Sequence, residues 1–118
     1  MTGGQMAPTT MLGQVTATTQ EGRNPIYHGY PLKVSELLAV LPGATYIERC
    51  GLCSPAHIRK AKAALKHAFE LQMNQKNGLS LVELLSPCPT YWRMTPPDAM
   101  LHIQNEMTKV FPLGRLKG

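Results

Sequence analysis

The sequence predicts an α/β domain in which parallel strands carry flanking helices and follow a long N-terminal loop. Two short runs, 44–49 and 79–85, have the composition of strands, and a segment with helical periodicity, 54–73, separates them. Alternation of strand and helix favours a parallel sheet. The first thirty residues are rich in Gly, Thr, Pro and Gln, which indicates a loop with at most one short helical turn.

The elements expected after the loop begin with a helix over 32–41, which Pro42-Gly43 ends. After the strand at 44–49, Ser54-Pro55 provides an N-cap and a first-turn proline for the long helix. We expect this helix to stop near Asn77-Gly78, a favourable C-cap pair. Its apolar stripe follows i, i+3 and i+4 spacing and consists of Ile58, Ala61, Leu65, Ala68, Phe69 and Met73.

The run 79–85 is mostly apolar and has the length of a buried parallel strand. The segment 95–98 resembles a capping box that opens a last helix, whose inner face is formed by Ile103, Met107, Val110 and Phe111. Stable sheets usually have about four to six strands, so two strands require completion by other residues or by a partner chain. We therefore expect the purified chain to expose apolar surface and to self-associate.

Composition excludes several classes of function. The formal net charge of +5 permits an acidic partner, but basic and aromatic residues are not interleaved as in a nucleic-acid-binding surface. No apolar run approaches the ~20 residues of a membrane span, and the N-terminus lacks the features of a secretory signal. These observations predict a cytoplasmic protein without a nucleic-acid or membrane partner.

Several motifs in a fixed order carry a family resemblance. Residues 1–10 read Met-Thr-Gly-Gly-Gln-Met-Ala-Pro-Thr-Thr, and Gly22-Arg23 and 29–31 (Gly-Tyr-Pro) follow. The segment 83–92 reads Glu-Leu-Leu-Ser-Pro-Cys-Pro-Thr-Tyr-Trp, and 111–114 reads Phe-Pro-Leu-Gly. Together they resemble the C-terminal part of the thiamine-diphosphate-binding (beta) subunit of 2-oxoacid:ferredoxin oxidoreductases. The first five residues also begin a common expression tag, but a tag explains none of the later motifs.

The resemblance implies a partial thiamine-diphosphate-binding-type fold, with a cofactor-proximal loop region at 1–31 and an α/β segment at 32–118. It implies a role in the coenzyme A-dependent oxidative decarboxylation of a 2-oxoacid, with electrons passed to ferredoxin. Either 2-oxoglutarate or a branched-chain acid such as 2-oxoisovalerate fits. The implied partners are the other subunits of an oligomeric oxidoreductase and ferredoxin.

The resemblance also implies site residues. It places Thr2, Gly3, Gly4 and Gln5 beside thiamine diphosphate, where adjacent glycines permit close approach of the backbone. Cys88 resembles the fourth thiolate ligand of a [4Fe–4S] cluster, which normally needs four. The simpler interpretations are a Gly-Gly turn without a ligand and a buried free thiol. No residue is assigned a catalytic role.

The family's magnesium-binding motif, Gly-Asp-Gly with a following Asn-containing turn, is absent from the sequence. Without such oxygen ligands nothing bridges Mg²⁺ to the diphosphate. We therefore expect the isolated chain to bind no cofactor and to be inactive outside the complete complex. The alternative is a catalytically inactive remnant that acts as a structural or interaction domain.

Cys50 and Cys53 form a CxxC pair before a helix, a pattern found in redox-active and zinc-binding proteins. A structural zinc site needs two more ligands. The candidates, at spacings unlike those of zinc fingers, are Cys88, His28, His57, His67 and His102. We interpret the pair as incidental thiols, with a small redox protein as the alternative.

Overall fold

The computed structural model describes residues 7–74 and 78–118. Its centre is a βαβ unit in which strand β1 (Ala44–Gly51), helix α3 (Pro55–Met73) and strand β2 (Leu79–Leu85) follow one another, with the two strands parallel. Strand β3 (Gly114–Lys117) pairs antiparallel with the other edge of β1. The sheet is therefore mixed, with the order β2-β1-β3.

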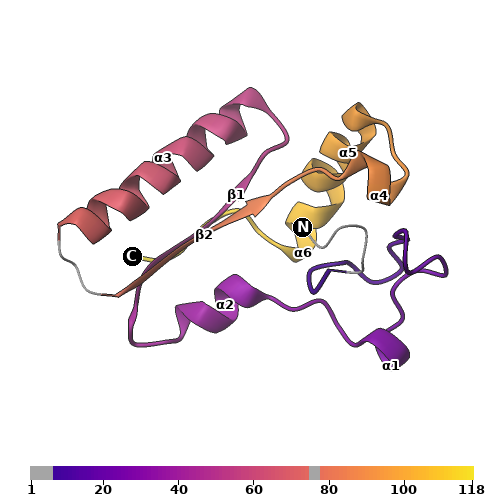
Figure 1. Cartoon of the computed structure of the whole chain (residues 1–118), viewed down its shortest axis with the longest axis horizontal. Coiled ribbons are helices and arrows are strands. Elements are labelled where there is room, and N and C mark those ends of the chain that lie inside the picture. Colours follow the sequence, from indigo (N-terminus) through magenta and orange to yellow (C-terminus); the bar gives the residue numbers. More distant parts are fainter. Residues whose placement is uncertain (1–6, 75–77) are drawn as a thin grey trace.

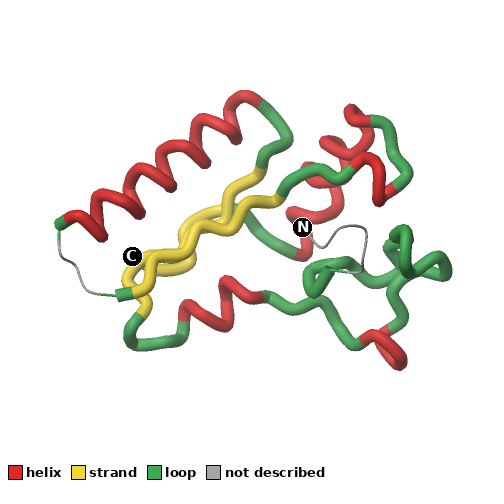
Figure 2. The backbone as a smooth tube through the Cα atoms, viewed as in Figure 1, coloured by secondary structure: helices red, strands yellow, loops and turns green. Residues whose placement is uncertain are grey.

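Helices cover both faces of the sheet, with α3 on one face and α2 (Val34–Ala39) on the other (Figure 1). Figure 2 shows that residues 7–33 are irregular apart from α1 (Pro25–His28), as the sequence predicted. The last helical segments lie beyond one end of the strands (Figure 1). They are α4 (Pro89–Trp92), α5 (Pro96–His102), the π-helical turn η1 (Ile103–Met107) and α6 (Thr108–Val110).

The packing of α3 confirms the predicted apolar stripe at Ala61 and Ala68 and corrects it at the larger residues. Tyr46 and Cys50 of β1 are buried against Ala61 and Ala64, so alanines form the inner face of the helix. The larger side chains of the predicted stripe are exposed, by 41% at Ile58, 38% at Leu65, 68% at Phe69 and 81% at Met73. Small residues let the helix lie close to the strand, and this close approach turns the large side chains outward.

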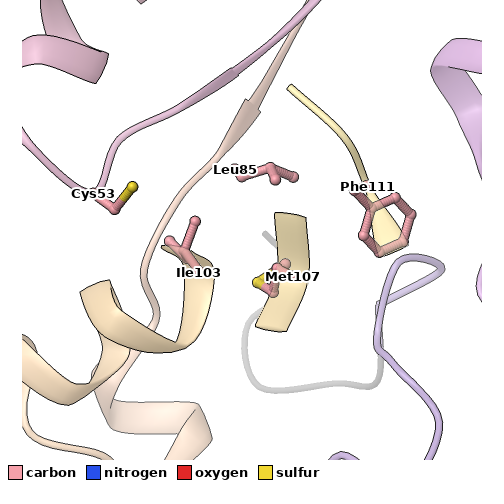
Figure 3. Packing of buried hydrophobic residues seen from close by; sticks show 5 residues of the cluster. All are labelled: Cys53, Leu85, Ile103, Met107 and Phe111. Carbon is pink, nitrogen blue, oxygen red and sulfur yellow. The ribbon is translucent and has the colours of Figure 1, made fainter. Parts of the chain in front are cut away.

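A second core joins the end of β2 to the C-terminal helices (Figure 3). It contains Cys53, Leu85, Ile103, Met107 and Phe111, which confirms the predicted inner face of the last helix. The capping prediction is also confirmed, since the Thr95 hydroxyl accepts a hydrogen bond of 3.3 Å from the Asp98 backbone N–H. This core lies next to the turn that contains Cys88, at the carboxyl end of β2; we call residues 86–88 the cysteine turn.

Three expectations about the elements need correction. β2 is half-exposed rather than buried, because it is an edge strand whose only partner among the described residues is β1. Strand β3 was not predicted, since Gly114, Arg115 and Lys117 give so short a segment no strand pattern. Helix α3 ends at Met73, earlier than predicted. The α/β class is confirmed, but with a mixed sheet in place of a purely parallel one.

No helix within 7–74 or 78–118 is both long and apolar enough to cross a membrane.

Candidate functional site

A cavity of about 320 Å³ opens where β2 ends. The N-terminal loop forms one side of it, and the cysteine turn with the C-terminal helices forms the other. Its walls consist of Ala7, Pro8, Thr9, Thr10, Thr16, Glu83, Leu84, Leu85, Ser86, Cys88, Tyr91, Trp92 and Met107. The carboxyl ends of parallel strands are where α/β proteins usually bind ligands, so this cavity is the candidate site.

Cys88 occupies a restrained position in the cavity wall. It immediately precedes α4, and prolines at positions 87 and 89 fix the backbone on both sides. The thiol is free and half-buried. A thiol held in this way, at the edge of a cavity, is suited to bind a metal or a cluster.

The predicted cofactor residues Thr2, Gly3, Gly4 and Gln5 lie outside the described residues. The loop that continues from them is described, and its residues Ala7–Thr10 line the same cavity as Cys88. Two motifs that are far apart in the sequence therefore meet at one site. This proximity was not predictable from the spacing of the motifs.

Arg23 holds this loop in place. Its side chain is only 6% exposed. Its Nη1 atom donates hydrogen bonds of 2.7 Å to Thr10 O and 2.8 Å to Pro8 O. The whole guanidinium binds the carbonyl oxygens of Ala7, Pro8, Thr10, His28, Gly29 and Tyr30. One side chain thus ties the cavity wall to the segment after α1.

No carboxylate within the described residues forms an ion pair with Arg23, so only carbonyl dipoles balance its charge. A buried cation of this kind favours negative charge nearby. Because Arg23 lies directly behind the loop that lines the cavity, the wall formed by Ala7–Thr10 is electrostatically suited to an anionic group.

Glu83 brings a carboxylate to the opposite wall, and that carboxylate is already bound. Its Oε2 atom accepts a 2.8 Å bond from Arg49 Nε and a bond from the Ser35 hydroxyl. Arg49 also binds Glu36 of α2, and hydrogen bonding to Arg49 lowers the pKa of the Glu36 carboxyl. The network therefore fixes Glu83 and joins α2 to the cavity wall.

Thr16 contributes a polar group that lacks a partner. This residue lines the cavity and is 3% exposed, and its hydroxyl makes no hydrogen bond within the described part of the chain. A buried hydroxyl without a partner costs about 1–3 kcal/mol, so such groups are rare unless a ligand or water satisfies them. Thr16 is therefore a second indication, independent of Cys88, that something binds here.

The CxxC residues do not reach this site. Cys50 packs beside Tyr46 under α3, whereas Cys53 belongs to the core at the end of β2. Both thiols are free, and burial raises the pKa of Cys50. Cys53 Sγ lies 3.3 Å from His57 Nδ1. In the described ranges, no three His, Cys, Asp or Glu side chains are grouped to hold a metal ion.

Two arginines that organise this region, Arg23 and Arg49, were not predicted as site residues. For Arg49 a signal exists in the sequence, because a charged residue inside a strand with buried neighbours is usually paired with an opposite charge. For Arg23 the sequence offers only the Gly22-Arg23 motif. Its role depends on the carbonyl groups of an irregular loop, and no sequence pattern encodes those.

Neither a family model nor a solved structure matches the chain. Curated proteins do match. The chain is 50% identical over 113 residues to the ketoisovalerate oxidoreductase subunit VorA of Methanothermobacter marburgensis, a match that covers 96% of this chain and 23% of VorA. It is 35% identical over 109 residues to the 2-oxoglutarate synthase subunit KorB of Archaeoglobus fulgidus, covering 92% of this chain and 36% of KorB. The chain thus spans about a quarter of VorA and about a third of KorB.

Proposed function

Because this chain belongs to the family of 2-oxoacid:ferredoxin oxidoreductase subunits, we propose that it forms one part of such an enzyme. The proposed reaction is the oxidative decarboxylation of a 2-oxoacid, with transfer of the acyl group to coenzyme A and of electrons to ferredoxin. The observation that carries the proposal is the 50% identity to VorA over 96% of the chain. We assign the activity to the assembly that contains this chain, since the match spans only part of VorA.

The relatives suggest an order of substrates. Identity is higher to the ketoisovalerate oxidoreductase subunit than to the 2-oxoglutarate synthase subunit, at 50% against 35%. A branched-chain 2-oxoacid is therefore the first candidate and 2-oxoglutarate the second.

We assign Cys88 as one thiolate ligand of a [4Fe–4S] cluster. Three features fit this role: the thiol is free, it lines a cavity, and two prolines restrain it. The buried Thr16 hydroxyl, which has no hydrogen-bond partner among the described residues, and the positive charge of Arg23 suit an anionic, sulfur-rich group in the same cavity. Cys50 and Cys53 lie outside the cavity wall, so the other three thiolates come from elsewhere in the assembly.

We place the cofactor contacts on Thr2, Gly3, Gly4 and Gln5, which directly precede the described cavity wall. Thiamine diphosphate, when bound, supplies the carbanion stabilisation that loss of CO₂ from a 2-oxoacid requires. The contribution of this chain is to orient the group. Arg23 restrains the loop next to those residues, and a restrained loop loses little entropy when a ligand binds. We assign the Mg²⁺ ligands to other parts of the assembly.

The test is to isolate the complex through an affinity tag on this chain and to assay coenzyme A-dependent reduction of a low-potential viologen dye. We expect activity with 2-oxoisovalerate or 2-oxoglutarate and less with pyruvate. Cys88→Ser should remove iron and the low-temperature EPR signal of one cluster, whereas Cys50→Ala, the matched thiol control, should retain both. Lack of dye reduction with all three acids, in a complex that contains this chain, would contradict the proposal and favour a purely structural role.

A further inference from the structure

A second cavity lies between the N-terminal loop and the C-terminal helical segments, and the proposed function does not use it. Its volume is about 510 Å³, within the range of roughly 300–1,000 Å³ that is typical of small-molecule sites. The loop, the residue before α2 and the C-terminal helical segments line it, and it is open to solvent. Its walls consist of Met11, Leu12, Tyr30, Pro31, Lys33, Glu106, Lys109 and Val110.

The walls of this cavity are mainly apolar. Met11 and Val110 pack with their inner sides against the core that contains Met107. Leu12 and Tyr30 are 46% and 72% exposed, so the cavity presents large apolar side chains to solvent. A ligand that covered them would remove apolar surface from water, which favours binding.

The cavity is held open by hydrogen bonds rather than by its own side chains. Arg23 Nη2 donates a 2.8 Å bond to Tyr30 O, and its Nη1 binds Thr10 O, which directly precedes Met11. The amide of Met11 is bonded to Gln14 Oε1 at 3.0 Å, and Gly13 N–H donates to Arg23 O at 2.9 Å. Preformed walls lower the entropic cost of binding, as in most small-molecule sites.

The charges at the rim leave one cation unpaired. Glu106 is occupied by Lys109, whose ammonium lies 3.1 Å from both carboxylate oxygens. Lys33 forms no ion pair with any carboxylate in the described residues. Glu36, the acidic residue whose titration Lys33 influences, already binds Arg49 through both oxygens. The rim therefore carries a net charge of +1 (two lysines and one glutamate).

We propose that this cavity binds a small amphiphilic carboxylate, whose hydrocarbon part lies on Met11, Leu12, Tyr30 and Val110 and whose carboxylate pairs with Lys33. The charge of the rim selects an anion over a cation, and the apolar walls select a ligand with a hydrocarbon body. The site is separate from the cavity that contains Cys88, and it does not depend on the proposed oxidoreductase activity.

The experiment uses the full chain and isothermal titration calorimetry with three probes of equal chain length: octanoate, octanol and octylamine. We expect saturable binding of octanoate at 1:1 stoichiometry, with octanol about threefold weaker, because octanol cannot form an ion pair with the exposed Lys33. Octylamine should be the weakest of the three. Equal affinity for octanoate and octanol, tighter binding of octylamine, or no saturable binding of octanoate would each overturn the proposal.

Two variants locate the site. Lys33→Gln should weaken octanoate binding by about threefold and leave octanol unchanged, since it removes only the proposed charge pair at an exposed position. Lys62→Gln removes the same charge from an exposed position on α3, far along the chain from the cavity, and should change neither affinity. Leu12→Ser should weaken octanoate and octanol together. An unchanged octanoate affinity in Lys33→Gln, with a circular dichroism spectrum like that of the unaltered chain, would refute the assignment.

Discussion

Arg49 of β1 and Glu83 of β2 form an ion pair across the central strand pairing, with Arg49 Nε 2.8 Å from Glu83 Oε2. The two residues are directly opposite each other in the parallel register. Arg49 is 1% exposed, and its guanidinium also binds Glu36 and the Pro112 carbonyl. The pair thus connects both strands to α2 and to the segment that follows the last helix.

Replacing Arg49 should therefore be strongly destabilising. Removal of one member of a buried ion pair typically costs about 3–5 kcal/mol, because the remaining charge is left desolvated. We expect Arg49→Met to lower the free energy of unfolding by about this amount in urea titrations. The control is Lys109→Met, which removes an exposed pair worth about 0–1 kcal/mol. Similar costs for the two variants would show that the Arg49 network does not stabilise the fold.

The same network predicts how stability depends on pH. Hydrogen bonding to Arg49 lowers the pKa of Glu36 below its ordinary value of 4.5. A carboxyl with a lowered pKa in the folded state stabilises the fold above the unfolded pKa, and this contribution is lost as the pH falls through the folded pKa. We expect the free energy of unfolding to decrease below about pH 4.5, and Glu36→Gln to flatten the decrease. Parallel pH curves for both proteins would contradict this assignment.

Arg23 should control the order of the N-terminal loop. The guanidinium of Arg23 has donors on three nitrogens and binds both Pro8 O and Tyr30 O. A lysine has all its donors on one nitrogen, so it cannot bind both carbonyls in the same way. We expect Arg23→Lys to speed amide hydrogen exchange in the loop, measured by mass spectrometry at residues 10–16 and at Leu32, whose N–H binds Pro8 O. Exchange in α3 should stay unchanged. Arg59→Lys, an exposed conservative change, should leave the loop protected.

Thr16 offers a test of the cavity that needs no cofactor. Its buried hydroxyl has no partner among the described residues, and valine has nearly the same shape. Because valine removes the desolvation cost of about 1–3 kcal/mol, we expect Thr16→Val to raise the thermal midpoint of the isolated chain. Thr16→Ser keeps the hydroxyl and should not stabilise. A loss of stability in Thr16→Val would show that the hydroxyl has an internal partner, and would remove Thr16 from the argument for a bound ligand.

The sequence predicted those parts of the fold that depend on local patterns. The Ser54 and Thr95 caps, the strand at 79–85 and the buried face of Ile103, Met107 and Phe111 all follow from signals within a few residues. The orientation of α3 did not follow, because two adjacent stripes satisfy helical spacing and only the packing distance to β1 selects the alanine face. The size of the side chains therefore determines which face of α3 packs against β1, and the periodicity of the sequence does not.

The candidate site was predictable only in its separate parts. Cys88 could be chosen from its turn, but its meeting with Thr10 and Thr16 in one cavity depends on the loop that Arg23 holds. Strand β3 shows the same limit. It binds the far edge of β1 although its own residues carry no strand pattern, since backbone pairing requires no particular side chains.

The exposed side of α3 should make the isolated chain self-associate. Phe69 and Met73 are 68% and 81% exposed, and the neighbouring strand β2 is an edge strand within the described sheet. Exposed apolar patches and unpaired strand edges both promote association.

We expect sedimentation velocity to show a concentration-dependent increase in mass, and Phe69→Glu to shift the equilibrium toward monomer without loss of helix content. Ala63→Glu adds the same charge at an exposed position on α3 without removing a large apolar side chain, and should have a smaller effect. A monomer at all concentrations would show that the exposed apolar side chains of α3 do not drive self-association. It would also count against the expectation that other residues or a partner chain complete the sheet.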